Sequence, residues 1–263
     1  MATQKGSIIL EGQIGNLSFY RSNGKPLARQ RSGVSKERIA KDPRYVRTRE
    51  NNTEFGRASS AARLIRLAAR LSLGERHELF EDTTLVNRLT PRMAAIVRAD
   101  DIHGRGERVV LPKSLSLLHG FSFNAVSALK DVLFKPPHYT YRRKTGLLEV
   151  AVPELCPISA LKVPKGGEFC SFHVAAILFG ADYERLPFVA QANELLPLGH
   201  QALPPQLFRL ELPEASLDPV IICFGISFFR SQGGYPVPIV EQGRNLFEVI
   251  GVEVDCSDDM DIQ

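Results

Sequence analysis

Apolar residues recur at helical spacing in the stretch 42–71, which reads DPRYVRTRENNTEFGRASSAARLIRLAARL. At i, i+3, i+4, i+7 and i+10 they form one stripe, which consists of Ala61, Leu64, Ile65, Ala68 and Leu71. Asp42 followed by Pro43 is a typical helix start, with the carboxylate as N-cap and proline at the first position, and Thr48 offers a second possible start about one turn later. The pattern therefore predicts a long amphipathic helix, and Gly56 inside it favours a closely packed neighbour.

Helical spacing continues over residues 72–100, where the apolar stripe consists of Leu85, Leu89, Met93, Ile96 and Val97. Thr90 followed by Pro91 is itself a possible helix start, so we expect either two short helices or one kinked helix. The HGRGER stretch at 103–108 then predicts a flexible loop. Residues 42–110 are therefore expected to form a helical segment.

The N-terminal region alternates apolar and polar residues in the manner of short strands. Ile8 and Leu10 alternate with polar neighbours, and Leu17 and Phe19 do the same. Ser22-Asn23-Gly24 is a good hairpin turn. A sheet this small cannot make a core alone, so it must lie on its own chain or complete the sheet of a neighbour.

From about residue 121 the pattern changes to short strands separated by prolines. The predicted strands are 129–134, 138–142, 147–152, 169–179, 185–192, 207–212, 221–229 and 246–254. This spacing predicts an antiparallel β-sandwich over 121–255, followed by an acidic tail at 256–263. The expected fold class is thus α+β, with a β-hairpin and basic arm at 1–41, the helical segment, and the C-terminal sandwich.

Length and composition fit a globular protein, with 263 residues of which 44% are hydrophobic. No apolar run approaches the length of a membrane span, and the N-terminus lacks the features of a signal peptide. We therefore expect synthesis in the cytoplasm, with a released or virus-like assembly left open. The four cysteines lack metal-binding spacing and favour buried thiols; they are Cys156, Cys170, Cys223 and Cys256.

Charge is distributed unevenly along the chain. Residues 1–110 carry a net charge of +9 and residues 111–263 a net charge of −5. The arm at 21–49 holds ten basic residues against two acidic ones, which suits phosphate or an acidic surface on another copy. Tyr20 and Tyr45 are its only aromatic residues, a poor platform for stacking bases. The candidate polyanion contacts are Arg29, Arg31, Arg38, Arg44, Arg47, Arg49, Arg63, Arg66 and Arg70.

Motifs of catalysis are weak in this sequence. The GGEF letters at 166–169 spell the signature of cyclic-dinucleotide synthases, but they follow Val163-Pro164-Lys165 and favour a turn entering a strand. Cys170 and His173 fall on opposite faces of one strand, so they do not make a nucleophile pair. We therefore expect no enzymatic activity, no cofactor, no metal and no small-molecule substrate.

Three blocks resemble a family of uncharacterised proteins that is frequent in Bacteroidota genomes. They are IGNLSFYR at 14–21, Asp42-Pro43, and RTRENNTEFGRA at 47–58, and the late strand 221–229 followed by Tyr235-Pro236 is also similar. The resemblance covers most of the chain and implies no assigned activity. Pro91 departs from the continuous helix that the resemblance implies at that position.

These features favour a non-enzymatic structural subunit that assembles with copies of itself into a tube, filament, ring or phage-like shell. In this hypothesis residues 8–19 add to a neighbour's sheet edge. The expected assembly interface consists of Ile8, Leu10, Leu17, Phe19, Tyr20, Phe55 and Leu64. The alternative is a nucleic-acid-binding protein that uses the basic region 21–70. A β-sandwich module for carbohydrate is a third class, against which the absence of tryptophan argues.

Overall fold

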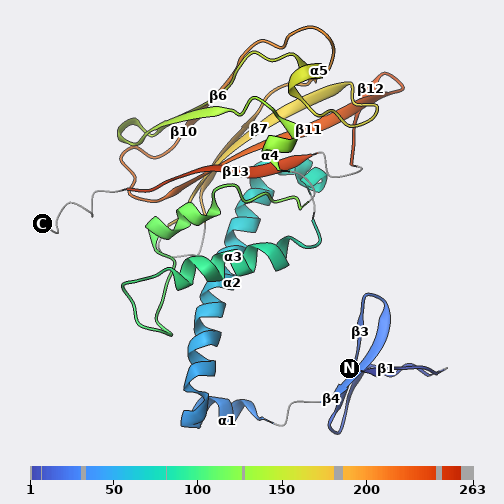
Figure 1. Cartoon of the computed structure of the whole chain (residues 1–263), viewed down its shortest axis with the longest axis vertical. Helices are drawn as coiled ribbons and strands as arrows, with labels where there is room; N and C mark the ends of the chain where they lie inside the picture. Colours follow the sequence, from blue (N-terminus) through green and yellow to red (C-terminus); the bar gives the residue numbers. More distant parts are fainter. Residues whose placement is uncertain are drawn as a thin grey trace, which may run out of the picture. The chain divides into compact units, whose positions relative to one another are not determined.

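The computed structural model describes residues 2–6, 8–30, 34–80, 82–125, 128–180, 186–240 and 245–255. The fold is α+β, with helices and several antiparallel sheets (Figure 1). The chain divides into two compact units, Met1–Asn51 and Asn52–Gln263.

The first unit holds a small antiparallel sheet with the strand order β1-β4-β3-β2 within the described residues. Its strands are β1 (Ala2–Thr3), β2 (Gly12–Ile14), β3 (Leu17–Ser22) and β4 (Lys25–Gln30). The β3–β4 hairpin closes with Ser22 opposite Lys25. Asn23 and Gly24 both have positive φ there, as a two-residue type I′ turn requires. The predicted hairpin turn is therefore confirmed.

The strand predicted at Ile8 and Leu10 is wrong, because residues 8–11 belong to no strand. The side chain of Gln4 takes the place of a strand partner. Its Oε1 accepts a hydrogen bond from Leu10 N at 2.9 Å, and its Nε2 donates to Leu10 O at 3.1 Å. A side-chain amide thus satisfies the backbone groups that a β-ladder would otherwise pair.

Two capped turns lead into the long helix. Ser35 Oγ accepts from Arg38 N at the start of α1 (Lys36–Lys41). Asp42 Oδ1 accepts from Arg44 N at 3.0 Å and caps the 3-10 turn η1 (Pro43–Tyr45). The predicted start at Asp42 and Pro43 is confirmed, with a single 3-10 turn before the α-helix.

Helix α2 (Val46–Leu73) begins in the first unit and continues into the second. The predicted stripe is buried at Ala61, Leu64, Ile65 and Ala68, whereas Leu71 is exposed. The packing neighbour predicted for Gly56 is absent, because no heavy atom of the described chain lies within 4 Å of the position that a Cβ would take.

The remaining helical elements are short, apart from α3. They are η2 (Gly74–Phe80), α3 (Leu85–Arg98), η3 (Pro112–Leu118), α4 (Leu129–Val132), η4 (Arg143–Thr145) and α5 (Pro157–Ala160). Pro91 lies inside α3, so of the two predicted alternatives the chain forms a single helix and not two short ones. Proline removes one intrahelical hydrogen bond, at a cost of about 3 kcal/mol. Burial of Leu89, Met93 and Ile96 on the same helix offsets that cost.

The sequence predicts a flexible loop at 103–108, but the structure holds this loop at both sides. Buried Asp100 accepts hydrogen bonds from the backbone nitrogens of Ile102, His103 and Val109. From α2, Glu54 Oε1 accepts from Gly106 N at 2.7 Å. These bonds replace the flexibility that the glycines and charges suggest.

Two antiparallel sheets form the rest of the second unit within the described residues. The larger sheet runs β12-β11-β7-β8, with β13 also paired to β11 and β9 to β7, and the smaller runs β10-β6-β5. The strands are β5 (His138–Arg142), β6 (Leu147–Val152), β7 (Phe169–Leu178), β8 (Phe188–Ala192), β9 (Leu196–Pro197), β10 (Gln206–Glu211), β11 (Val220–Gln232), β12 (Tyr235–Pro238) and β13 (Leu246–Glu253).

Both faces of the larger sheet are covered. On one face Phe172 and Phe224 pack with Phe208 of the smaller sheet in an inter-sheet core. On the other face Ile177 and Phe247 pack with side chains of α2 and α3 in a helix–sheet core. The second unit therefore has three layers, which are the smaller sheet, the larger sheet and the helices. The sheet pair confirms the predicted β-sandwich.

The strand predictions hold at β5, β6, β7, β10, β11 and β13, with ends that differ by a few residues. The strand predicted at 129–134 is wrong. That segment forms α4, whose first residue, Leu129, donates its N–H to Glu248 Oε2 at 2.8 Å. Strand β8 confirms the end of the predicted 185–192 strand, while residue 185, Cys256 and the tail at 256–263 lie outside the described residues.

Two turns within the sandwich depend on glycine. Gly233 and Gly234 have positive φ between β11 and β12. Gly146 follows η4 at φ 64°, and a Cβ there would overlap the carbonyl oxygen of Leu212. Only glycine fits this position, because the neighbouring backbone approaches too closely.

Candidate functional site

The sheet of the first unit has no hydrophobic core of its own. None of the residues described between 2 and 51 is buried. Several apolar side chains of this sheet region are strongly exposed, including Ile8 at 78%, Ile14 at 59% and Leu17 at 44%. A two- to four-stranded sheet needs a covered apolar face to be stable, so this one lacks the packing that usually supports such a sheet.

The register of the sheet gathers its apolar residues on one face. Paired residues of an antiparallel sheet share a face, and successive residues along a strand alternate between faces. Leu17 pairs with Ile14, and Phe19 pairs with Ala28, so these four lie together. We define the apolar face as Ala2, Ile14, Leu17, Phe19, Pro26 and Ala28, with Arg21 and Gln30 at its margins by the same register.

The opposite face of the sheet is mainly polar, with Leu27 as an apolar residue there, since Leu27 pairs with Tyr20. Ser18 and Tyr20 lie there, since they alternate with Leu17 and Phe19 along β3. Arg29 lies over the ring of Tyr20, with 5.5 Å between its Cζ atom and the ring centroid. This cation–π contact links β3 to β4 on the mainly polar face.

The residues predicted for assembly are not all in one place. Leu17 and Phe19 belong to the apolar face, Tyr20 lies on the polar face, and Ile8 and Leu10 lie in the connection from β1 to β2. Two others lie on α2. Phe55 is 58% exposed, whereas Leu64 is 3% exposed in the helix–sheet core and is not available to a partner.

The arginines predicted for polyanion contact are largely engaged within the first unit. Arg38 pairs with Asp42, and Arg47 pairs with Glu50 at 3.2 Å. Arg49 donates to the carbonyl oxygens of Ile39 and Asp42, which fixes the turn before α2. Arg44 is exposed, and Arg31 lies outside the described residues.

The remaining arginines of that prediction lie on the second half of α2. Arg63 is exposed. Arg66 and Arg70 line a pocket of about 300 Å³ in the second unit.

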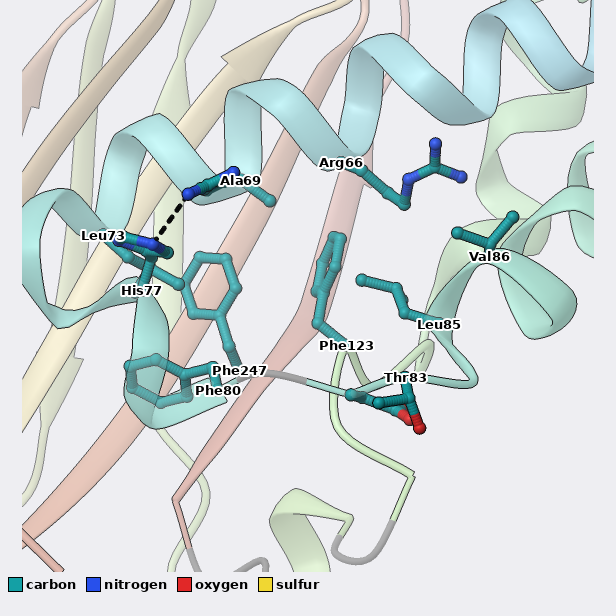
Figure 2. A pocket seen from close by; sticks show the side chains of 12 residues that line it. Arg66, Ala69, Leu73, His77, Phe80, Thr83, Leu85, Val86, Phe123 and Phe247 are labelled. Atoms are coloured by element: carbon teal, nitrogen blue, oxygen red, sulfur yellow. Dashed lines mark hydrogen bonds between the residues drawn. The ribbon is translucent and has the colours of Figure 1, made fainter. Parts of the chain in front are cut away.

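The pocket is formed by several elements that are distant in sequence (Figure 2). Arg66, Arg70 and Leu73 come from α2, Phe80 from η2, Leu85 from the start of α3, Phe123 from the segment before α4, and Phe247 from β13. Phe247 contacts both other phenyl rings, with centroid distances of 6.0 Å to Phe80 and 5.4 Å to Phe123. We call these three rings, together with Leu73 and Leu85, the apolar floor.

The pocket is lined by two arginines and one aspartate that differ in their partners. Asp82 accepts from Arg88 and Thr84; burial raises the pKa of this carboxyl, but these hydrogen bonds outweigh it and hold the pKa below its usual value. Arg70 Nη2 lies 3.0 Å from His77 Nε2. Arg66 has no hydrogen-bond or ion-pair partner among the described residues. Within the described residues, Asp82 is thus paired with Arg88, whereas Arg66 and Arg70 have no acidic partner.

Next to Phe80 of this pocket, a serine and a histidine lie within hydrogen-bond distance, as they do in some catalytic sites. His173 Nε2 lies 2.7 Å from Ser227 Oγ, and Phe80 packs edge-on against the imidazole at 5.6 Å. Burial, and to a lesser extent the charge of Arg76, lowers the pKa of His173 to about 3. Because Ser227 is completely buried, no substrate can reach its hydroxyl in this arrangement.

The cysteines and the GGEF letters have structural positions. Cys170 faces the inter-sheet core and His173 the other side of the sheet, so the predicted separation is confirmed. Burial raises the pKa of the Cys170 thiol to about 12 and also raises that of Cys223. Gly166 and Gly167 form the predicted turn into β7, where Glu168 N donates to Phe229 O. Over the described ranges, no cluster of three metal-ligating side chains occurs.

The fold and these sites define an α+β protein with a coreless N-terminal sheet and a three-layered second unit. Comparisons with protein-family models, with curated proteins and with solved structures find no match to this chain. Among the described helices, none combines the length and apolar character needed to cross a membrane.

Proposed function

We propose that this protein is a non-enzymatic structural subunit that assembles with copies of itself through its N-terminal sheet. The observation that supports this proposal is the exposed apolar face of a sheet in a unit without a buried residue among those described. Burial of apolar surface stabilises by about 25 cal/mol per Å². Packing of this face against a second copy would supply the cover that the sheet lacks.

The strand geometry favours association through faces over the addition of residues 8–19 to a neighbour's edge. Strand β3 already pairs on both sides, with β2 and with β4. The edge strands β1 and β2 are two and three residues long, which limits the ladder that they can extend. Two copies related by a two-fold axis would instead bring the same face together from both partners.

A charge placed on the apolar face tests the proposal. We expect Phe19→Glu to abolish association, because a buried unpaired carboxylate is strongly unfavourable in an apolar interface. Ser18→Glu is the matched control, since it adds the same charge to the same strand on the polar face. The measurement is molar mass by light scattering over a concentration series, with electron microscopy of the largest species.

The expected result is an oligomer or polymer for the unaltered chain and for Ser18→Glu, and a monomer for Phe19→Glu. The proposal would be overturned if the unaltered chain stayed monomeric at every concentration. Equal effects of the two substitutions would overturn the role of the apolar face.

Nucleic-acid binding by residues 21–70 is the less well supported function. Arg38, Arg47 and Arg49 each have a partner within the first unit. Binding to phosphates would compete with these contacts and would weaken steeply as salt concentration rises. Retention on DNA or RNA at low salt, lost at moderate salt, would favour this alternative over self-assembly.

A further inference from the structure

The pocket beside α2 combines an apolar interior with positive charge at its side. Its volume of about 300 Å³ lies at the lower end of the range for small-molecule sites. The apolar floor presents three phenyl rings, and Figure 2 shows these rings on the side of α2 from which Arg66 also extends. An apolar body of modest size can therefore bury itself against side chains that are already in place.

The charge of the pocket decides which polar group such a ligand would carry. Arg70 lies within hydrogen-bond distance of His77 Nε2, while His77 Nδ1 lies 2.9 Å from Gly74 O. These contacts fit a neutral imidazole that is protonated at Nδ1, which leaves the charge of Arg70 uncompensated. Arg66 adds a second positive charge, and Asp82 is paired with Arg88. An anionic headgroup is the complement of this arrangement.

We propose that this pocket binds a small amphiphilic anion, an alkyl or aryl carboxylate whose apolar body lies on the apolar floor and whose headgroup pairs with Arg66 and Arg70. The site lies wholly in the second unit and does not depend on self-assembly through the N-terminal sheet. Planar guanidinium groups hold carboxylates through paired N–H donors, which lysine cannot do in the same geometry.

Decanoate tests the proposal by isothermal titration calorimetry, at concentrations below micelle formation. Decylammonium is the matched ligand, because it has the same chain and the opposite charge. We expect saturable binding of decanoate at one site per chain and no comparable binding of decylammonium. Arg66→Gln and Arg70→Gln should each weaken decanoate binding by about tenfold, as expected for the loss of one charge-assisted hydrogen bond.

Arg63→Gln is the control, since Arg63 is exposed on the same helix and does not line the pocket. Val86→Asp provides a second route, because Val86 lines the pocket and is half exposed, so the substitution is compatible with folding. Val86→Asp should weaken decanoate binding at least as much as Arg66→Gln does, whereas Val86→Lys should not weaken decanoate binding.

Circular dichroism confirms that each variant retains its fold. Failure of the unaltered chain to bind decanoate would overturn the proposal. Equal affinities for decanoate and decylammonium would overturn it as well, because they indicate adsorption to apolar surface without recognition of charge. An effect of Arg63→Gln equal to that of Arg66→Gln would remove the assigned headgroup contacts.

Discussion

At the scale of single residues, Asp100 is the carboxylate with the most complete set of partners. It is buried at the end of α3 and accepts backbone hydrogen bonds from Ile102, His103 and Val109, with a further contact to His103 Nδ1 at 2.8 Å. Burial raises the pKa of this carboxyl, but these hydrogen bonds outweigh burial and hold the pKa well below its usual range. One side chain thus fixes three backbone nitrogens of the loop that follows the helix.

Asp100 accepts hydrogen bonds through both Oδ1 and Oδ2, whereas an asparagine has only one oxygen that can accept. Asp100→Asn should therefore lower the free energy of unfolding by about 2 kcal/mol at neutral pH. Since the folded-state pKa is depressed, the stabilisation is present in full above the unfolded pKa, about 3.9, and it decreases progressively as the pH falls from there through the folded-state pKa. Urea unfolding of both proteins at pH 7 and pH 3 measures this difference.

The control for that prediction is Asp101→Asn, which changes the neighbouring and exposed carboxylate. Asp101 pairs with Lys113 on the surface, where ion pairs contribute little. A loss of stability that is equal for the two substitutions, or that does not shrink in acid for Asp100→Asn, would contradict the assigned role.

At the scale of elements, the block RTRENNTEFGRA does more than form a helix. It places Glu54 and Arg57 of α2 against the loop after α3. Arg57 Nη1 donates to the carbonyl oxygens of Gly106 at 3.0 Å and Arg108 at 2.7 Å. The block therefore connects two segments that are about fifty residues apart in the chain.

Arg57→Ala should increase amide exchange in residues 104–109 by about tenfold, because it removes two hydrogen bonds from a charged donor. Arg63→Ala, an exposed change on the same helix, should leave that exchange unaltered. Hydrogen–deuterium exchange with mass spectrometry measures both variants. Faster exchange that extends equally to β7 and β11 would indicate global destabilisation and would contradict local anchoring.

At the scale of the whole molecule, the two compact units differ in how they are stabilised. Asn52–Gln263 holds both the helix–sheet core and the inter-sheet core. Met1–Asn51 has no buried residue among those described. The free energy of folding of the chain therefore resides in the second unit.

Deletion of residues 2–30 should lower Tm by less than about 3 °C, because it removes no residue from either core. The comparison is made in dilute solution, where association adds nothing to stability. Differential scanning calorimetry of the full and shortened chains measures it. A loss of more than about 10 °C would show that the N-terminal sheet contributes to the core stability of the monomer.

Much of the fold could be predicted because its elements depend on local chemistry. The Asn23-Gly24 turn needs positive φ at both residues, which these two residue types tolerate. Continuous apolar runs rich in β-branched residues marked β7 and β11, because a sheet packed on both faces buries successive residues of a strand. Helical spacing likewise located the buried stripe of α2.

Other features depend on neighbours that are remote in sequence. Pro91 reads as a helix start, yet burial of the α3 face keeps the helix continuous. The 129–134 run reads as a strand, yet Glu248 accepts the first N–H of α4. The pocket carried no motif, because Phe80, Phe123 and Phe247 come from separate segments and meet only after folding.

The sequence by itself determined the α+β class, the hairpin, the long amphipathic helix and most strands of the sandwich, because each follows from periodicity and turn chemistry within a few residues. The tertiary structure alone decided that Leu64 packs in the core of its own chain and not against a partner, that the apolar side chains of the N-terminal sheet share one uncovered face, and that Arg66 and Arg70 stand beside three phenyl rings. Packing and charge at a site depend on which distant residues meet, and no local pattern records that.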